Sequence, residues 1–267
     1  HGNFDLVEIP ATADAEDVAR RLAAQADVEY AQPRYRVRPL FTPNDPLYTQ
    51  QWNYHALDMD RAWDINPGAT SSVIVAVLDS GVAYLNRTIR FNATSPVLIE
   101  GFFSQPVMFP ALGILDIPFA AAPDLGGPER FVAPRDFIWD DQTPVDLDGH
   151  GTHVAGTIGQ LTNNSVGAAG MAFNVRLMPV KVIDGFWDAY FGSPFTGTDD
   201  VVARGVRYAV DNGAQVLNMS IGRTGDPAPV VQDAIAYAVS RGAFVSVAAG
   251  NEFLEDNPVE RLAEFAP

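Results

Sequence analysis

Short apolar runs alternate with longer amphipathic segments from Ser71 to the end of the chain. Near-continuous apolar runs are typical of the strands of a parallel sheet, which helices cover on both faces. The segments between the runs indicate helices, and two of them end in Asn-Gly or Arg-Gly, a common helix stop. We expect strands at 72–81, 175–183, 214–220 and 243–251, and helices at 150–161, 199–213 and 229–242. This alternation predicts an α/β fold with a central, mostly parallel sheet between layers of helices.

The first 40 residues have a different pattern, in which a charged amphipathic helix stands between two strand-like stretches. Asp14 precedes the helix and is expected to cap it. A unit of this size cannot bury a core of its own, so it needs the support of a larger body. We expect a small α+β unit over 1–40, with strands at 4–10 and 28–40 around a helix at 14–25, a turn-rich junction at 42–46, and a main domain over 41–267.

Residues 84–122 interrupt the alternation. They are rich in apolar residues and proline but follow no clean period. We therefore expect an irregular surface insertion at about 84–122, without chemistry of its own. A second aromatic-rich segment, 185–197, is expected to form a loop at the rim of a cleft.

Composition narrows the classes of function. The formal net charge of −16 argues against a nucleic-acid partner, because phosphates would be repelled. No apolar run is long enough to span a bilayer, so we expect no membrane partner. The chain has no cysteine, which excludes thiol catalysis, disulfides and thiolate metal sites. Lys181 is its single lysine.

Three polar residues stand where an α/β sheet collects its reacting groups, at the carboxyl ends of strands and the start of a helix. Asp79 closes an apolar strand, so its carboxylate is expected to be partly desolvated. His150 opens a helix, and a buried carboxylate bonded to one ring nitrogen would fix its tautomer and stabilise the imidazolium. Asn251 follows another strand, where its amide could donate to a developing oxyanion. The pattern indicates acid–base chemistry at this edge.

Four motifs occur in order along the chain: VIVAVLDSGV, DGHGTHVAGTIG, LNMSIG and VSVAAGNE. Together they resemble the signature blocks of the subtilisin-like serine peptidases, a match that runs from about Thr42 onward. The resemblance implies a three-layer subtilisin-like fold and hydrolysis of protein or peptide substrates by a monomer. It assigns Asp79 as the triad aspartate, His150 as the general base and Asn251 to the oxyanion hole. The substrate-binding residues that it implies are Ser220, Ile221, Gly222, Ala248, Ala249 and Gly250.

Residues 1–40 resemble the end of the inhibitory propeptide that precedes such enzymes. This resemblance implies an intramolecular inhibitor that is cleaved off between about Leu40 and Thr42. A plain N-terminal extension is the alternative. The family resemblance also implies secretion, although no signal peptide is visible in the sequence.

A structural calcium site is a further implication, because TPNDP and TNNSVGAAG resemble the segments that hold a tightly bound calcium in thermitase-like members. Hard oxygen ligands suit this ion. The residues implied are the side chains of Asp45, Asp124 and Asn164 and the carbonyl groups of Leu161, Val166 and Ala168.

The nucleophile of the family lies in a Gly-Thr-Ser motif, and no such motif occurs in this sequence. Ser220 and Ser80 do not replace it, because neither lies in a nucleophile turn of the hydrolase type. We therefore expect a sequence truncated before the catalytic serine, with a sheet incomplete on its C-terminal side, and an inactive polypeptide. One alternative is a catalytically inactive, subtilase-like peptide-binding module. Another is a zinc hydrolase built on His150 and His153, although their spacing of three does not match a zinc motif.

Overall fold

The computed structural model describes residues 4–35, 41–100, 103–223 and 228–251. Its contacts divide the chain into two compact units, His1–Leu40 and Phe41–Pro267. Among the described residues, no helix is both long and apolar enough to cross a membrane.

The small unit contains one helix, α1 (Ala15–Ala23). The expected cap is confirmed, because the side chain of Asp14 accepts hydrogen bonds from the backbone N–H groups of Glu16 and Asp17. The predicted strands are wrong for 4–10 and 28–35, where the described chain has no regular structure, and 36–40 lies outside the described residues. A strand needs a neighbour for its backbone groups, and these two stretches do not pair.

The main unit is built around a five-stranded sheet in the order β6-β7-β1-β8-β9, in which every neighbouring pair is parallel. Its strands are β1 (Ile74–Asp79), β6 (Arg135–Asp136), β7 (Arg176–Lys181), β8 (Val216–Met219) and β9 (Phe244–Val247). The α-helices of this unit are α2 (Trp52–Ala56), α3 (Met59–Ile65), α4 (His150–Gly159), α5 (Phe186–Tyr190), α6 (Asp199–Asp211) and α7 (Pro229–Ser240). Single turns of 3-10 helix occur at Tyr48–Gln50 and Pro128–Arg130.

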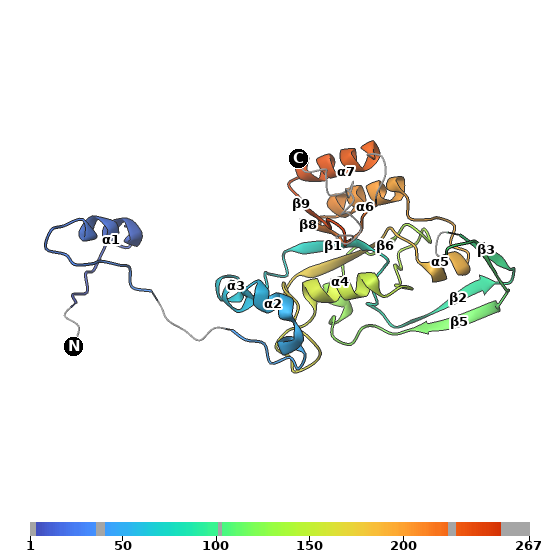
Figure 1. The fold of residues 1–267 in the computed structure, drawn as a ribbon, viewed down its shortest axis with the longest axis horizontal. Helices are drawn as coiled ribbons and strands as arrows, with labels where there is room; N and C mark the ends of the chain where they lie inside the picture. Colours follow the sequence, from blue (N-terminus) through green and yellow to red (C-terminus); the bar gives the residue numbers. More distant parts are fainter. Residues whose placement is uncertain (1–3, 36–40, 101–102, 224–227, 252–267) are drawn as a thin grey trace. The chain divides into compact units, whose positions relative to one another are not determined.

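Helices cover the two faces of the sheet unequally, as Figure 1 shows. Ala76 and Leu78 of β1 face a large apolar core that α6 and α7 complete. Val75 and Val77 of the same strand face the opposite side, where they pack with Ala155 of α4 in a smaller core. This arrangement is the predicted three-layer α/β fold, and the predicted strands and helices of the sheet region are confirmed within a few residues.

The carboxyl ends of the three strands β6, β7 and β1 lie side by side. In the register of the sheet, Asp79 at the end of β1 is the neighbour of Lys181 at the end of β7. Lys181 is in turn the neighbour of Asp136 at the end of β6. One row across the sheet therefore brings together a carboxylate, an ammonium group and a second carboxylate.

The insertion is regular, so our expectation of an irregular excursion at 84–122 is wrong. β2 (Arg87–Ala93) pairs with β5 (Gly113–Phe119), and β3 (Val97–Ile99) pairs with β4 (Val107–Phe109), both antiparallel. In the chain, β3 and β4 lie between β2 and β5, and we call the described residues of 87–119 the hairpin arm (Figure 1).

The hairpin arm lies on α5, the helix within the segment that we expected to be a loop. The ring of Phe91 stacks on that of Phe191 with centroids 4.3 Å apart, and the hydroxyl of Tyr190 donates to the carbonyl of Pro110 over 2.8 Å. Phe109 meets Phe186 edge to face. Aromatic packing therefore joins the insertion to the carboxyl edge of the sheet.

Candidate active site

Asp79 and His150 form a hydrogen-bonded pair at the carboxyl end of β1. The distance between Asp79 Oδ1 and His150 Nδ1 is 2.7 Å. The carboxylate is completely buried, whereas the side chain of His150 is 48% exposed. A buried acceptor on Nδ1 leaves the other ring nitrogen free to meet a reacting group from solvent, which is the arrangement that a general base requires.

Burial and hydrogen bonding shift both pKa values of the pair. Burial raises the pKa of Asp79 above its usual range, and the hydrogen bond from His150 opposes this rise. The hydrogen bond to Asp79 raises the pKa of His150, and the charges of Asp148 and Asp146 act in the same direction. The site therefore favours the imidazolium form that proton transfer from a nucleophile would produce.

Close backbone approach at Gly151 places the imidazole beside Asp79. A side chain at Gly151 would overlap the carbonyl oxygen of Gly81 and would come within 3.0 Å of Asp79 Cβ. Gly149, just before the helix, has a φ of 103°, which favours glycine. Two glycines thus allow the first turn of α4 to lie against the end of β1.

Asp146 fixes the start of α4 with a dense set of hydrogen bonds. One carboxylate oxygen accepts from the hydroxyl of Ser80 and the other from both the N–H and the hydroxyl of Thr152. The N–H groups of Asp148 and Gly149 also donate to the first oxygen. Ser80 Oγ in turn accepts from the N–H of Gly151 over 3.0 Å. Burial alone would raise the pKa of Asp146, but these bonds outweigh it and hold the pKa below its usual range, and they join β1 to α4.

The roles of Ser80 and of the Asp146 carboxylate were not predicted from the sequence. Ser80 stands in the VIVAVLDSGV motif and Asp146 two residues before the DGHGTHVAGTIG motif, but their pairing joins positions 66 apart in the chain. An aspartate four residues before the helix start, followed by Gly149, was the available signal, since acidic side chains often satisfy the free N–H groups there.

The predicted substrate-binding residues lie just beyond two neighbouring strands. Ser220–Gly222 follows β8, and the Ser220 hydroxyl accepts from the side chain of Asn218. Ala248–Gly250 follows β9, and the N–H of Ala248 extends the ladder to the carbonyl of Met219. Asn251 comes next in the chain, so it lies beyond the end of β9, two strands from Asp79 in the sheet order.

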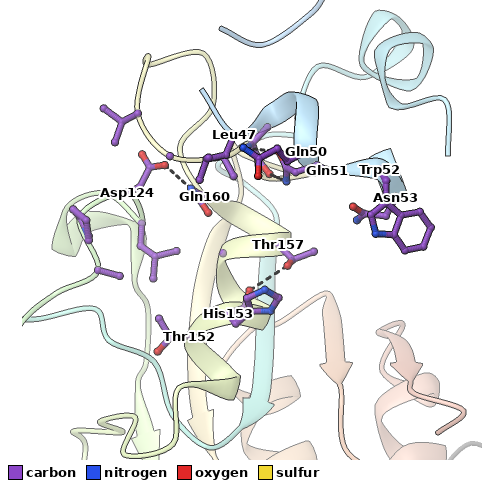
Figure 2. A pocket seen from close by; sticks show the side chains of 18 residues that line it. Leu47, Gln50, Gln51, Trp52, Asn53, Asp124, Thr152, His153, Thr157 and Gln160 are labelled. Atoms are coloured by element: carbon purple, nitrogen blue, oxygen red, sulfur yellow. Dashed lines mark hydrogen bonds between the residues drawn. The ribbon is translucent and has the colours of Figure 1, made fainter. Parts of the chain in front are cut away.

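A groove of about 630 Å³ runs along the side of α4 that faces away from the sheet, as Figure 2 shows. Exposed His153 lines it, together with Trp52 and Asn53 at the start of α2. His153 follows His150 by nearly one turn of α4. Among the residues that the structure describes, no group of three or more His, Asp or Glu side chains could hold a metal, so the two histidines gain no third ligand for zinc.

The side chains implied as calcium ligands come together at the far end of α4. Asp45 and Asp124 are both buried. Asp45 accepts from the N–H groups of Asn163 and Asn164, and Asp124 accepts from the side chains of Asn164 and Gln160 (Figure 2 shows the latter bond). Leu161, Val166 and Ala168 belong to the same segment. Two buried carboxylates and an amide beside one loop are a donor set of the kind that calcium prefers.

The comparisons with known proteins agree with this arrangement. The model of the subtilase family, Peptidase_S8, matches residues 70–263. A thermophilic serine proteinase of Bacillus sp. (strain AK1) is 32% identical over 239 residues, which are 89% of this chain and 48% of the relative. An extracellular basic protease of Dichelobacter nodosus is 31% identical over 275 residues, covering 94% of this chain and 41% of the relative. The chain thus spans about half the length of these relatives.

A solved protease structure from Pseudoalteromonas arctica has the same fold, with a TM-score of 0.56 and 27% identity. The similarity covers 79% of this chain and 60% of that structure. The order of the sheet, the order of the motifs and the family match support the same conclusion: the chain belongs to the subtilase family.

Proposed function

We propose that this chain supplies the acid–base half of a serine endopeptidase. His150 takes the proton of an attacking serine hydroxyl, and Asp79 holds the ring and stabilises the imidazolium. The observation that carries the proposal is the 2.7 Å bond between a buried carboxylate and a half-exposed imidazole. Because the printed sequence has no Gly-Thr-Ser motif, the polypeptide as printed is proposed to be inactive.

The oxyanion and the substrate are assigned to the ends of β8 and β9. Asn251 donates its amide to the oxyanion of the tetrahedral intermediate. An extended peptide binds along Ser220–Gly222 and Ala248–Gly250, the segments that directly follow β8 and β9. The substrates are accordingly proteins or peptides in extended form.

The small unit and the location of the protein are also part of the proposal. Residues 1–40 are proposed to be the end of a propeptide that inhibits its own peptidase. Because a relative is named an extracellular protease, we also propose that the protein is secreted, and that it acts as a monomer.

The test measures the rate at which the complete gene product, whatever its length, hydrolyses denatured casein. Changing His150→Ala should lower kcat/KM by about a thousandfold or more, because the general base is lost. His153→Ala is the matched control, since it removes a second histidine from the same helix without touching Asp79, and it should change the rate by no more than a few-fold. A serine-directed sulfonyl fluoride should abolish activity.

Equal losses in the two histidine variants would contradict the assignment of His150 as the base. A gene product that binds denatured casein without cleaving it would replace the proposal with that of a peptide-binding module.

We propose a structural calcium ion at the residues around Asp124. The side chains of Asp45, Asp124 and Asn164 would hold it, together with carbonyl groups of the segment 161–168. When bound, the ion would neutralise two buried carboxylates and join the start of the main unit to the end of α4. It would take no part in proton transfer.

Calcium at about a hundred times its dissociation constant should stabilise the folded chain by about 3 kcal/mol and raise its Tm by roughly 5–10 °C. Chelation should reverse the rise. Asp124→Asn should remove most of the effect, whereas Asp116→Asn, which changes an exposed carboxylate on the hairpin arm, should retain it. A Tm that is indifferent to calcium would exclude the site.

A further inference from the structure

One buried cation lies among three buried carboxylates at the carboxyl edge of the sheet. Lys181 stands between Asp79 and Asp136 in the register, and Asp188 approaches it from α5. The side chains of Lys181 and Asp188 are completely buried, and Asp79 and Asp136 are likewise without solvent exposure. Neighbours in register on parallel strands point to the same face, so Lys181 shares the α4 face with Asp79.

The ammonium group of Lys181 joins three separate parts of the chain. Its Nζ lies 2.7 Å from Asp188 Oδ1 and donates to the carbonyl of Val145 over 3.0 Å. Asp188 also accepts from Trp139 Nε1 over 2.7 Å and from the N–H of Gly185 over 3.0 Å. The strand β7, the helix α5 and the loop that precedes α4 therefore meet at this one ammonium group.

Stability alone does not account for such a cluster. Burying an ammonium and its carboxylate partners costs several kcal/mol of hydration per ion, and apolar side chains of similar volume stabilise a core equally well or better. What the ion pair adds is a fixed geometry, because each charged group must keep its partner.

The loop that Lys181 holds is the one that delivers His150. Val145 lies five residues before the histidine, and its carbonyl is bonded to Lys181. Leu147 packs into the aromatic cluster of Phe91 and Phe191. Gly185, at the start of α5, lies so close to Asp148 that an added Cβ would be 3.4 Å from that side chain. Lys181, the hairpin arm and the start of α5 thus contact the loop at Val145, Leu147 and Asp148.

We propose that Lys181 is a positioning residue, which holds the 145–149 loop so that His150 stays in bonding distance of Asp79. It touches neither of them through its ammonium group and acts through the carbonyl of Val145. Asp188 completes the device by fixing the ammonium group and linking it to α5. The inference that Lys181 supports peptide hydrolysis rests on the proposed function. The inference that Lys181 holds His150 in place does not depend on that function.

The test is an NMR titration of the His150 ring in the 267-residue chain, with the resonance assigned by His150→Gln. Asp79→Asn provides the reference for a broken pair. Lys181→Met combined with Asp188→Asn removes the buried ion pair and leaves no unpaired charge between these two positions. Arg61→Met combined with Asp58→Asn is the matched control, because it removes an exposed ion pair of the same charge types.

The proposal expects the pKa of His150 to fall toward its ordinary value in the Lys181/Asp188 double variant, as in Asp79→Asn, and to stay raised in the control. A double variant that folds, judged by its near-ultraviolet circular dichroism, and titrates at His150 as the unchanged chain does would overturn the proposal. If the double variant does not fold, Asp188→Asn alone decides the question, since it is isosteric. It should shift the pKa of His150 in the same direction, and an unshifted titration would again overturn the proposal.

Acylation offers an independent check, because Lys181 is the single lysine. An amine-reactive acylating reagent should modify Lys181 about a hundredfold more slowly than the lysine introduced by Arg61→Lys. The reason is that the structure around buried Lys181 must first open locally. Equal rates would show that the contact with Val145 does not form and would end the proposal. None of these measurements needs proteolytic activity, so failure of the proposed function would leave their outcome unchanged.

Discussion

Asp79 and Asp136 are two buried aspartates at the carboxyl ends of strands on either side of β7, and they have different partners. Each has one carboxylate oxygen that accepts hydrogen bonds and another without a partner among the described residues. Asp79 bonds to a half-exposed imidazole, whereas Asp136 faces the buried ammonium group of Lys181.

Burial alone does not make a carboxylate reactive. Burial raises the pKa of both groups, and that of Asp136 reaches about 7 despite the opposing charge of Lys181. Of the two, only Asp79 is hydrogen-bonded to a group that solvent and substrate can reach. The position of the partner, rather than the carboxylate itself, separates a catalytic aspartate from a structural one.

The largest effect that we expect is a pH-dependent gain from Asp136→Asn. With a pKa of 3.8 unfolded and about 7 folded, Asp136 keeps its proton in the folded state while the unfolded chain loses it. Its contribution to the free energy of unfolding is therefore full below pH 4 and declines as the pH rises to 7. The variant lacks this decline, so it should gain up to about 4 kcal/mol relative to the unchanged chain across that window.

Urea unfolding at pH 4, 5.5 and 7.5 measures this gain. Asp233→Asn, at an exposed position of α7, is the control and should show no such trend. A constant difference between the Asp136 variant and the unchanged chain at all three pH values would mean that Asp136 is ionised when folded.

A smaller effect, a loss of stability, is expected where α4 contacts β1, beside Asp79. Gly151→Ala should cost about 3 kcal/mol in the free energy of unfolding, because the new methyl group overlaps the backbone of Gly81 and pushes α4 from β1. The pKa of His150 should fall as its bond to Asp79 lengthens. Both quantities are measurable by urea unfolding and NMR titration.

Gly156→Ala is the matched control for this variant. Gly156 is also a buried glycine of α4, but an added Cβ would meet only the side chain of Gln160, at 3.2 Å. It should be neutral or gain up to about 1 kcal/mol from the higher helix propensity of alanine. Similar losses at the two positions would show that the contact between Gly151 and β1 has no special importance.

The smallest effect on stability is expected at Ser80. Ser80→Ala removes the hydroxyl that joins Gly151 to Asp146, so it should cost about 1–2 kcal/mol and leave the Asp79–His150 bond in place. Ser240→Ala, at the exposed end of α7, should change stability by less than about 0.5 kcal/mol. If Ser80→Ala instead lowers the pKa of His150 as far as Asp79→Asn does, then Ser80 positions the pair directly.

The sheet and its acid–base pair could be predicted because their signals are local. The apolar runs that contain β1 and β7 are nearly continuous, and the helix that begins at His150 has small residues along its length. Parallel strands collect their carboxyl ends at one edge, so a pair at that edge followed from the pattern before any distance was known.

The hairpin arm and the Lys181 cluster could not be predicted in this way. In the arm, Ile89, Phe91 and Ala93 of β2 lie at alternate positions in the cluster that contains Phe191, but the break in the strand at 94–96 and the prolines beyond it hide the period of two. In the cluster, Lys181 and Asp188 are close in sequence, yet the carbonyl of Val145 lies 36 residues away. Single ionisable residues at the end of a strand are compatible with many partners, and only the packed structure selects one.

The strand β9 has consequences for the self-association of this polypeptide in solution. Within the described residues, it pairs with β8 alone, and Phe244 at its start is 66% exposed. Over the residues that the structure describes, the outer edge of β9 presents its N–H and carbonyl groups to any second chain that approaches it. Light scattering by preparations of the 267-residue chain should accordingly increase with protein concentration. Added salt should screen the repulsion between chains that each carry sixteen excess negative charges, so self-association should begin at a lower protein concentration.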